Sequence, residues 1–270
     1  MIRDFYLPSG AAPLDQAHGL RRLFGGRRQH VLALAANPHV AFSGAVLDRL
    51  AAVLAAMGRH VLVVDAGASS PPPDALAAVD LSACIETLSA RVSYLPARGL
   101  PRAYVDTRGS AGGFIDALQA AAPHADVLLL HADGPDLARI FKRRAARPML
   151  LGADHPESIK HAYANCKMLV QRCGLMGHDL LLAASPQSPR AAAIAQSLSD
   201  CAEGFLGASL LHTALVDPAG DPAEAADESL SRLLAAQLML DDALRPETDM
   251  PAMPPPRRVP TAPTNRSVPR

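Results

Sequence analysis

The chain has 270 residues, a formal net charge of zero and an apolar fraction of 49%. This length suffices for one sizeable α/β domain with additional segments at its ends. The balanced charge argues against a charged tail protein and against indiscriminate nucleic-acid binding. The first ten residues lack a secretion-signal pattern, and no apolar run approaches the ~20 residues of a membrane span. We therefore expect a cytoplasmic protein, at most peripheral to a membrane.

The segment 1–28 is interpreted as an N-terminal leader that contains one short helix. The pattern at 14–24 predicts an amphipathic helix, which the glycine pair at 25–26 ends. Its apolar face comprises Ala17, Leu20, Leu23 and Phe24. Taken by itself, this helix is either a docking element on a tether or an ordinary capping helix.

The segment 29–245 alternates buried apolar runs with helical periodicity. Strands are expected at 28–35, 60–65, 126–130, 148–152, 179–184 and 209–216. Helices are expected at 44–57, 113–122, 134–146, 157–173, 190–206 and 223–244. This order predicts an α/β domain with a doubly wound, mostly parallel sheet and helices on both faces. The segment 246–270 is rich in proline and is predicted to be a disordered tail.

The loop at 36–44 (ANPHVAFSG) follows the first strand, where an open parallel sheet binds its ligand. A phosphate cradle at this place requires several glycines, a lysine and a Ser or Thr for magnesium. This loop contains a single glycine, and no lysine precedes Lys142 in the chain. Arginine is a poor substitute, because its planar fork does not fit the compact ammonium site. The layout of a phosphate-binding ATPase is present, but efficient phosphoryl transfer is not expected.

Several segments resemble the MinD/ParA class of deviant Walker ATPases and, within it, the FlhG (FleN) regulators of flagellar number. The DQAxxLR signature of that family is reproduced upstream of the first strand by Asp15, Gln16, Ala17, Leu20 and Arg21. The stretches 57–66 (MGRHVLVVDA), 151–163 and 201–210 (CAEGFLGASL) resemble further family segments. The resemblance implies a MinD-like P-loop fold of the SIMIBI type. It also implies that the leader docks on FlhF, a signal-recognition-type GTPase, and stimulates its GTP hydrolysis.

Aligned with that family, the chain departs from it where nucleotide chemistry would occur. The signature lysine aligns with Pro38, the catalytic-loop lysine with Ser43 and the magnesium-binding threonine with Gly44. Asp65 remains of an acid pair whose second member is Gly67. The resemblance therefore implies a degenerate nucleotide site made of Asn37, Pro38, His39, Phe42, Ser43, Gly44, Asp65, Gly67, His131 (at the Walker B aspartate) and Ala184 (at the base-contacting asparagine).

Two polar clusters allow other interpretations. His131 and Asp133 could form a protonatable pair that replaces a metal, although a structural polar pair is favoured. A zinc site is suggested by Asp154, His155, Glu157, His161 and Cys166. The five-residue spacing of the last two does not align ligands on one helical face, so zinc is not expected.

The last predicted helix lies where relatives carry a membrane-targeting helix. It has an apolar stripe of Leu230, Leu233, Leu234 and Leu238. Its polar face sets Arg232 against Asp241 and Asp242, which is not the basic face that anionic lipid favours. We expect the stripe to pack against the domain, with weak or no membrane association.

The favoured hypothesis is a non-catalytic FlhG-like regulator of flagellar number and placement. It would be a monomer that needs neither ATP nor magnesium, with FlhF as partner and recruitment to the cell pole. Relatives also imply a flagellar transcription activator or a switch component as a partner, and no direct nucleic-acid binding is expected. Two alternatives are a residual, atypical MinD-like ATPase and an adaptor for another polar or secretion machine.

Overall fold

The computed structural model describes residues 29–221 and 227–243. The predictions for the leader helix at 14–24 and for the tail at 246–270 lie outside these residues. The same holds for residues 223–226 and 244 of the last predicted helix.

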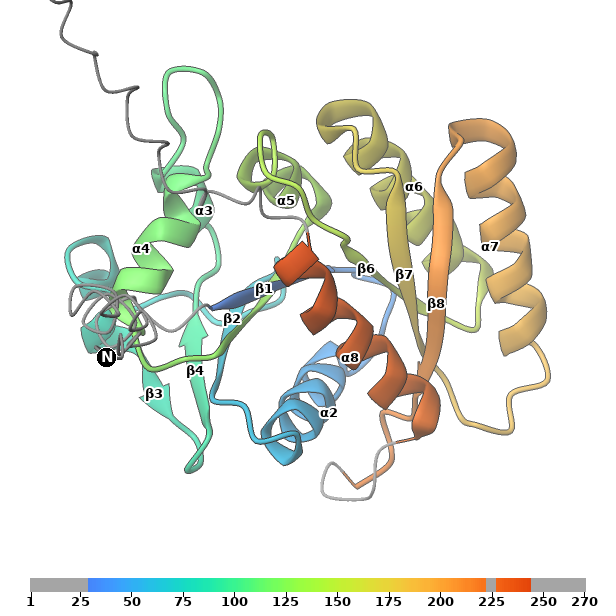
Figure 1. Ribbon diagram of the computed structural model, residues 1–270, viewed down its shortest axis with the longest axis horizontal. Coiled ribbons are helices and arrows are strands. Elements are labelled where there is room, and N and C mark those ends of the chain that lie inside the picture. Colours follow the sequence, from blue (N-terminus) through green and yellow to red (C-terminus); the bar gives the residue numbers. More distant parts are fainter. Residues whose placement is uncertain (1–28, 222–226, 244–270) are drawn as a thin grey trace, which may run out of the picture.

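One eight-stranded sheet forms the centre of the described residues (Figure 1). The strand order is β3-β4-β2-β5-β1-β6-β7-β8, and every neighbouring pair is parallel except β3–β4. The strands are β1 (His30–Ala35), β2 (Val61–Ala66), β3 (Glu86–Thr87), β4 (Val92–Pro96), β5 (Val127–Ala132), β6 (Met149–Ala153), β7 (Gly177–Ala183) and β8 (Ser209–Val216). The predicted α/β, mostly parallel sheet is confirmed.

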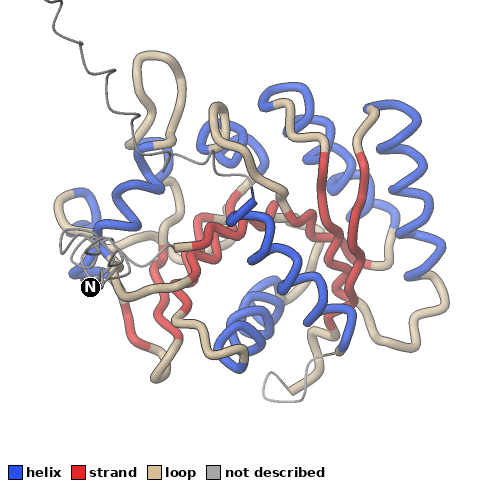
Figure 2. The backbone as a smooth tube through the Cα atoms, in the orientation of Figure 1, coloured by secondary structure: helices blue, strands red, loops and turns tan. Residues whose placement is uncertain are grey.

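The helices cover both faces of this sheet (Figure 2). They are α2 (Ser43–Ala56), α3 (Leu100–Ala103), α4 (Gly113–Ala121), α5 (Gly134–Ile140), α6 (Pro156–Cys173), α7 (Ala191–Leu206) and α8 (Glu228–Ala243). Two short 3-10 turns, η1 (Ala75–Ala78) and η2 (Ser82–Cys84), precede β3. Helices α2 and α8 pack on one face, and α4 to α7 pack on the other.

Strand β1 shows why the central strands are continuous apolar runs rather than alternating ones. Leu32 and Leu34 belong to the core under α2 and α8, whereas Ala33 and Ala35 belong to the core under α4 to α7. Successive side chains point to opposite faces of a sheet, and here both faces are covered. Because these strands run parallel, their carboxyl ends meet at one edge of the sheet. The loop at 36–44 lies at this edge.

Three features of the predicted pattern need correction. The strands β3 and β4 and the helix α3 were not predicted, because the stretch from 86 to 103 has no long apolar run. Helix α5 ends at Ile140, not at Ala146. A further turn would have added the like charges of 142–144 to the helix, and Arg144 instead pairs with Asp116 of α4 at 2.6 Å.

Helix α8 packs against the domain, as predicted. Leu230, Leu233, Leu234 and Leu238 are all buried in the core that covers β1 and β8. Among the described residues, no helix combines the length and the apolar character that crossing a membrane would require.

A buried carboxylate, that of Asp179, fastens α8 to the sheet. Asp179 is fully buried, and one of its oxygens lies 3.0 Å from Nε of Arg147. Its other oxygen lies 3.1 Å from Nδ1 of His212 on β8. Gln237 of α8 donates a hydrogen bond of 2.7 Å to the same carboxylate. The carboxylate of Asp179 thus contacts three separate parts of the chain, through Arg147, His212 and Gln237.

Replacing Arg147 with Met should lower the free energy of unfolding by about 3 kcal/mol, because it leaves a buried carboxylate without its guanidinium. Urea unfolding measures this change. The matched control is Arg232→Met, which removes an exposed guanidinium paired with Glu228 at 2.5 Å and should cost less than about 1 kcal/mol. Equal losses in the two variants would contradict the assignment.

Candidate functional site

The loop at 36–44 follows β1 at the carboxyl edge of the sheet, as predicted, and Asn37 fastens it from inside. Asn37 is 3% exposed. Its side-chain amide donates to the backbone oxygens of Leu151 and Ser158, at 2.8 Å each. Its side-chain oxygen accepts from the backbone N–H of His39 at 3.1 Å. The loop is therefore bound to β6 and to the first turn of α6 by a side chain of its own.

Imidazole groups surround this loop. The ring of His39 lies 6.5 Å from that of His155 and 5.7 Å from that of His161, measured between centroids. Nε2 of His155 lies 2.8 Å from the backbone oxygen of His39. Burial lowers the pKa of His161, and the charge of His39 lowers it further. The neutral form of His161 is thereby favoured, which weakens attraction for phosphate at this loop.

Phe42 keeps a backbone conformation that normally belongs to glycine. It precedes α2 with φ of 60° and ψ of 38°, in the left-handed region. A bulky residue there costs roughly 1 kcal/mol or more. Its side chain is 76% exposed, so core packing does not offset this cost. Ser43 and Gly44 follow as the first residues of α2, so the helix begins one residue before the predicted start at 44.

Asp65 and His131 form an ion-pair contact at the ends of β2 and β5. The sheet register sets the two residues side by side. Nδ1 of His131 lies 2.7 Å from a carboxylate oxygen of Asp65. The His131 side chain is 2% exposed, and that of Asp65 is 13% exposed. The carboxylate of Asp65 is therefore engaged by the imidazole of His131.

Gly67 provides the room for this pair. A Cβ atom at position 67 would lie 2.9 Å from Cε1 and 3.1 Å from Nδ1 of His131. The ring has little freedom to move away, because it is buried and held by Asp65. The position of the His131 ring thus requires a residue without a Cβ atom at position 67. An acidic side chain at 67 does not fit beside His131 as it lies here.

The predicted pairing of His131 with Asp133 is wrong. Asp133 turns to the loop after β2, where it accepts from the backbone N–H of Ala68 at 3.4 Å. His131 pairs with Asp65 because parallel register makes the two residues neighbours. Nε2 of His131 is buried without a hydrogen-bond partner. The structural polar pair expected at this place exists, but with a different acid.

Tyr94 belongs to the site and was missed in the sequence, because β4 was missed. Its hydroxyl donates to Asp65 Oδ2 at 3.4 Å. Ser70 donates to the backbone oxygen of Asp65 at 2.6 Å. A recognisable strand at 92–96 would have identified Tyr94, since β4 pairs directly with β2.

Ala184 lies at the end of β7 and is buried. Its backbone N–H donates to Val216 at 3.1 Å. The methyl side chain offers no polar group to a nucleotide base. Ala184 therefore lies directly after β7 at the carboxyl edge, and its role at a nucleotide base stays a prediction.

The residues considered for zinc do not converge. His155 accepts from the backbone N–H of Ser158 and so caps α6. The sulfur of Cys166 lies 3.8 Å from Nδ1 of His178, inside the core. Across 29–221 and 227–243, no three His, Cys, Asp or Glu side chains are grouped so that they could hold a metal ion.

Two of the three lysines that the structure describes make contacts away from this loop. Lys142 donates to the backbone oxygen of Arg108 at 2.6 Å, and Lys160 pairs with Glu157 at 2.7 Å. Pro38, at the signature position, has no N–H to offer. The residues at this loop therefore do not fit a magnesium-bound nucleoside triphosphate.

Comparisons with known proteins place this geometry in a fold. No protein-family model matches the chain, and no curated protein matches it. The MinD cell division protein of Aquifex aeolicus, in complex with MinC, superimposes with a TM-score of 0.52 at 12% identity, over 77% of this chain and 96% of that chain. The chain has the MinD-like α/β fold.

Two further solved structures support the same conclusion. Cobyrinic acid a,c-diamide synthase of Mycobacterium smegmatis, with bound ADP and magnesium, gives a TM-score of 0.55 at 16% identity, over 80% of this chain and 97% of that chain. A plasmid partition protein of Borrelia burgdorferi gives 0.53 at 9% identity, over 78% of this chain and 100% of that chain. At these identities the similarity establishes the fold.

Gly67→Ala should lower the free energy of unfolding by about 1–3 kcal/mol, because the new methyl group overlaps His131. The control is Gly44→Ala, where an added Cβ meets nothing within 4 Å. That change, in the first turn of α2, should be neutral or stabilising by up to about 1 kcal/mol. In a His131→Ala background the cost of Gly67→Ala should largely disappear. Additive losses in the double variant would contradict the steric coupling.

The Asp65–His131 pair should also make stability depend on acid. Burial raises the pKa of Asp65, but the hydrogen bond and charge of His131 and the N–H of Gly67 lower it below the ordinary 3.8. A lowered pKa gives stability that is present above about pH 4 and is lost as pH falls through the folded-state value. The stability difference between wild type and Asp65→Asn, measured by urea unfolding, should therefore be larger at pH 7 than at pH 3. A difference that grows on acidification would contradict this.

Proposed function

We propose that this chain is a non-catalytic, FlhG-like regulator of flagellar number and placement that works without hydrolysing ATP. The observation that carries the proposal is the Asp65–His131 contact of 2.7 Å. It engages the acid that would orient magnesium, and it depends on Gly67 at the position of the second acid. A side-chain pair in the place of the metal supports a binding role over a catalytic one.

The state of the phosphate loop supports the same proposal. Asn37 ties the loop inward to β6 and α6. The chain has no lysine before Lys142 to neutralise a transferred phosphoryl group. We infer that ATP and magnesium binding are lost or weak and that the protein is a monomer, since nucleotide-driven dimerisation would require this loop.

The partner-binding part of the proposal rests on the leader. The signature residues Asp15, Gln16, Ala17, Leu20 and Arg21 resemble the segment with which relatives engage an FlhF-type GTPase. Gln16 would be nearest the GTPase chemistry, with Leu20 as apolar anchor and Arg21 as polar clamp. A flagellar transcription activator or switch component is a further partner that relatives suggest.

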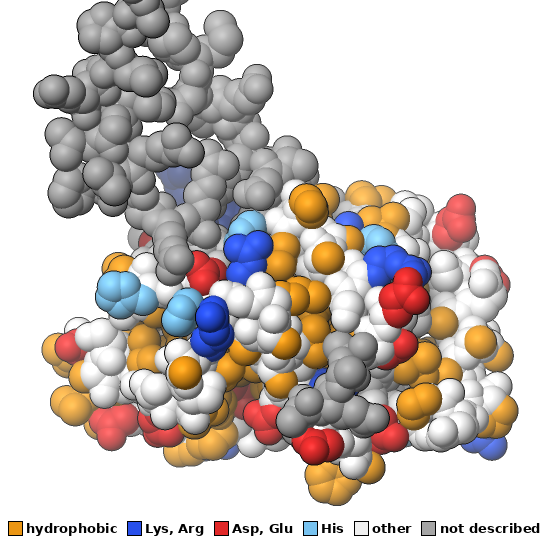
Figure 3. Space-filling view, turned by 60° about the horizontal axis from the view of Figure 1, so that its bottom comes forward, with side chains coloured by type: hydrophobic (Ala, Val, Ile, Leu, Met, Phe, Trp, Pro, Cys, Tyr) orange, Lys and Arg blue, Asp and Glu red, His pale blue; other side chains and the backbone are white. Residues whose placement is uncertain are grey.

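Surface charge supports a protein partner rather than a nucleic acid or an anionic membrane. On the described part of the face in Figure 3, basic and acidic side chains are interspersed with hydrophobic ones. Binding to a polyanion requires a clustered basic surface. We therefore propose a cytoplasmic protein that is recruited to the cell pole by its protein partner.

GTP hydrolysis by the FlhF protein of the same organism tests this function. Addition of the chain should stimulate turnover, and Gln16→Ala should reduce the stimulated rate by about tenfold, the effect of losing one well-placed polar group of roughly 1–2 kcal/mol. The matched control is Gln196→Ala, on the exposed face of α7, which should stimulate as the wild type does.

Two outcomes would contradict the proposal in different ways. No stimulation by the wild-type chain would remove the GTPase-activating mechanism and favour an adaptor for another polar or secretion machine. ATP turnover that Asp65→Ala abolishes, or ATP-dependent dimers in size-exclusion chromatography, would instead favour a residual atypical ATPase.

A further inference from the structure

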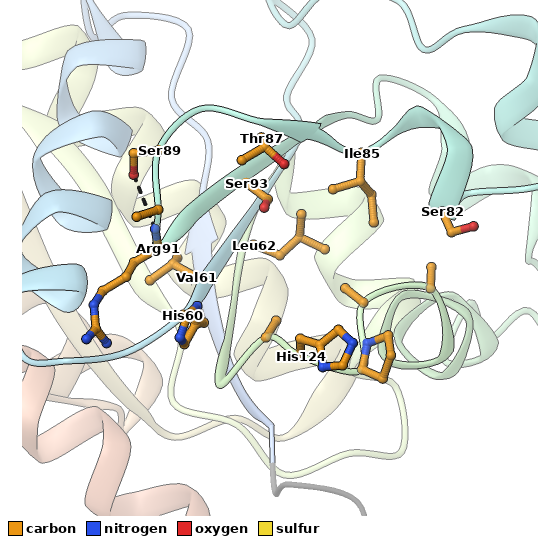
Figure 4. Close-up of a pocket in the computed structure, with 15 residues that line it drawn as sticks. His60, Val61, Leu62, Ser82, Ile85, Thr87, Ser89, Arg91, Ser93 and His124 are labelled. Carbon is orange, nitrogen blue, oxygen red and sulfur yellow. Dashed lines mark hydrogen bonds between the residues drawn. The ribbon is translucent and has the colours of Figure 1, made fainter.

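A cavity of about 340 Å³ lies at the amino-terminal edge of the sheet, away from the degenerate nucleotide site. It is enclosed by the start of β2, the β3–β4 hairpin, and the end of α4 with the loop to β5 (Figure 4). Its volume is at the low end of the roughly 300–1,000 Å³ of ligand pockets. A space of this size suits a few side chains better than a nucleotide.

The cavity has an apolar floor and a polar rim. Side chains of Leu62 and Ile85 line it, together with the alanines at 121, 122 and 125. Figure 4 shows Leu62 and Ser93 lying between the hairpin and the end of α4. His60, Arg91 and His124 lie at its margin. Leu62 is fully buried, whereas Ile85 and the alanines at 121 and 122 are partly exposed to solvent. Partly exposed apolar side chains favour an apolar side chain as the occupant.

The leader joins the domain beside this cavity. Gln29 is the first described residue, and its side chain is buried. Its amide donates to the backbone oxygen of Ala122, a cavity-lining residue, at 2.5 Å. The next residue, His30, donates from its backbone N–H to Asp126 at 2.9 Å. The point at which residues 1–28 attach is therefore fixed at the end of α4.

The short connection limits how far the leader's apolar residues can move from the cavity. Phe24 lies five positions before Gln29. At ~3.3–3.6 Å per residue it remains within about 18 Å of that attachment. A tether of this length gives an effective concentration on the order of millimolar. Even a weak apolar contact would then be substantially occupied.

We propose that the leader, in the absence of a partner, seats Leu23 and Phe24 in this cavity and so withholds the DQAxxLR signature. These two residues share the apolar face of the predicted helix with Leu20, so one face cannot serve the cavity and a partner at once. The effect of docking on partner binding rests on the proposed function, whereas the docking of the leader in the cavity does not.

Hydrogen–deuterium exchange of the full chain tests the docking without any partner. Backbone amides at 82–93 and 121–125 should exchange roughly two- to tenfold more slowly in the wild type than in Phe24→Ser, the range expected for a millimolar tether and a weak site. Ser93→Leu, which places a side chain inside the cavity, should weaken docking while leaving the leader sequence intact. The control Ser209→Leu, exposed on the opposite edge strand β8, should not change exchange at 121–125.

Hydrogen–deuterium exchange tests the docking of the leader, and stimulation of the FlhF GTPase tests the proposed partner. Equal exchange in the wild type and Phe24→Ser would overturn the docking, whatever the GTPase result. If docking is present, Ser93→Leu should stimulate the FlhF GTPase severalfold more than wild type at subsaturating concentration. Slower exchange with no GTPase stimulation by any variant would retain the docking and overturn only the proposed partner.

Discussion

The contact between Asp65 and His131 constrains the residues around it at the carboxyl edge of the sheet. Parallel register brings the ends of β2 and β5 together, so any acid at 65 faces whatever residue stands at 131. With histidine there, the pair is satisfied at 2.7 Å, and position 67 must lack a Cβ atom. The glycine at 67 and the histidine at 131 are thus coupled, because an acidic side chain placed at 67 alone would overlap His131.

The loop at 36–44 contains a backbone conformation that is unusual for its residue type. Phe42 adopts the left-handed conformation that glycine allows. The start of α2 therefore remains in its expected place despite a local cost. Asn37 holds the loop through hydrogen bonds to β6 and α6. A loop that is held by its own side chain needs no phosphate to order it.

The fold was predictable because the central strands are buried on both faces and so form unbroken apolar runs, such as 61–64 and 127–130. The segment 86–103 escaped prediction because β4 lies near the sheet edge and is only partly buried, which removes that signal. The residues that follow β1, β2, β5 and β7 could be named from the sequence, because the order of the apolar runs specifies which residue follows which strand. The sequence did not identify Asp65 as the partner of His131. Strand register sets which residues are neighbours across parallel strands, and it places Asp65 beside His131. Asp133 is nearer to His131 only in the sequence.

The two edges of the sheet have different relationships to the proposed function. At the carboxyl edge, the side chains of Asn37 and Asp65 make contacts within the protein. At the amino edge, an apolar cavity remains open beside the attachment of the leader at Gln29. Regulation through nucleotide would require the first edge to change shape. In the regulation proposed above, the leader exchanges the cavity for a partner, and this exchange requires no change in the folded domain.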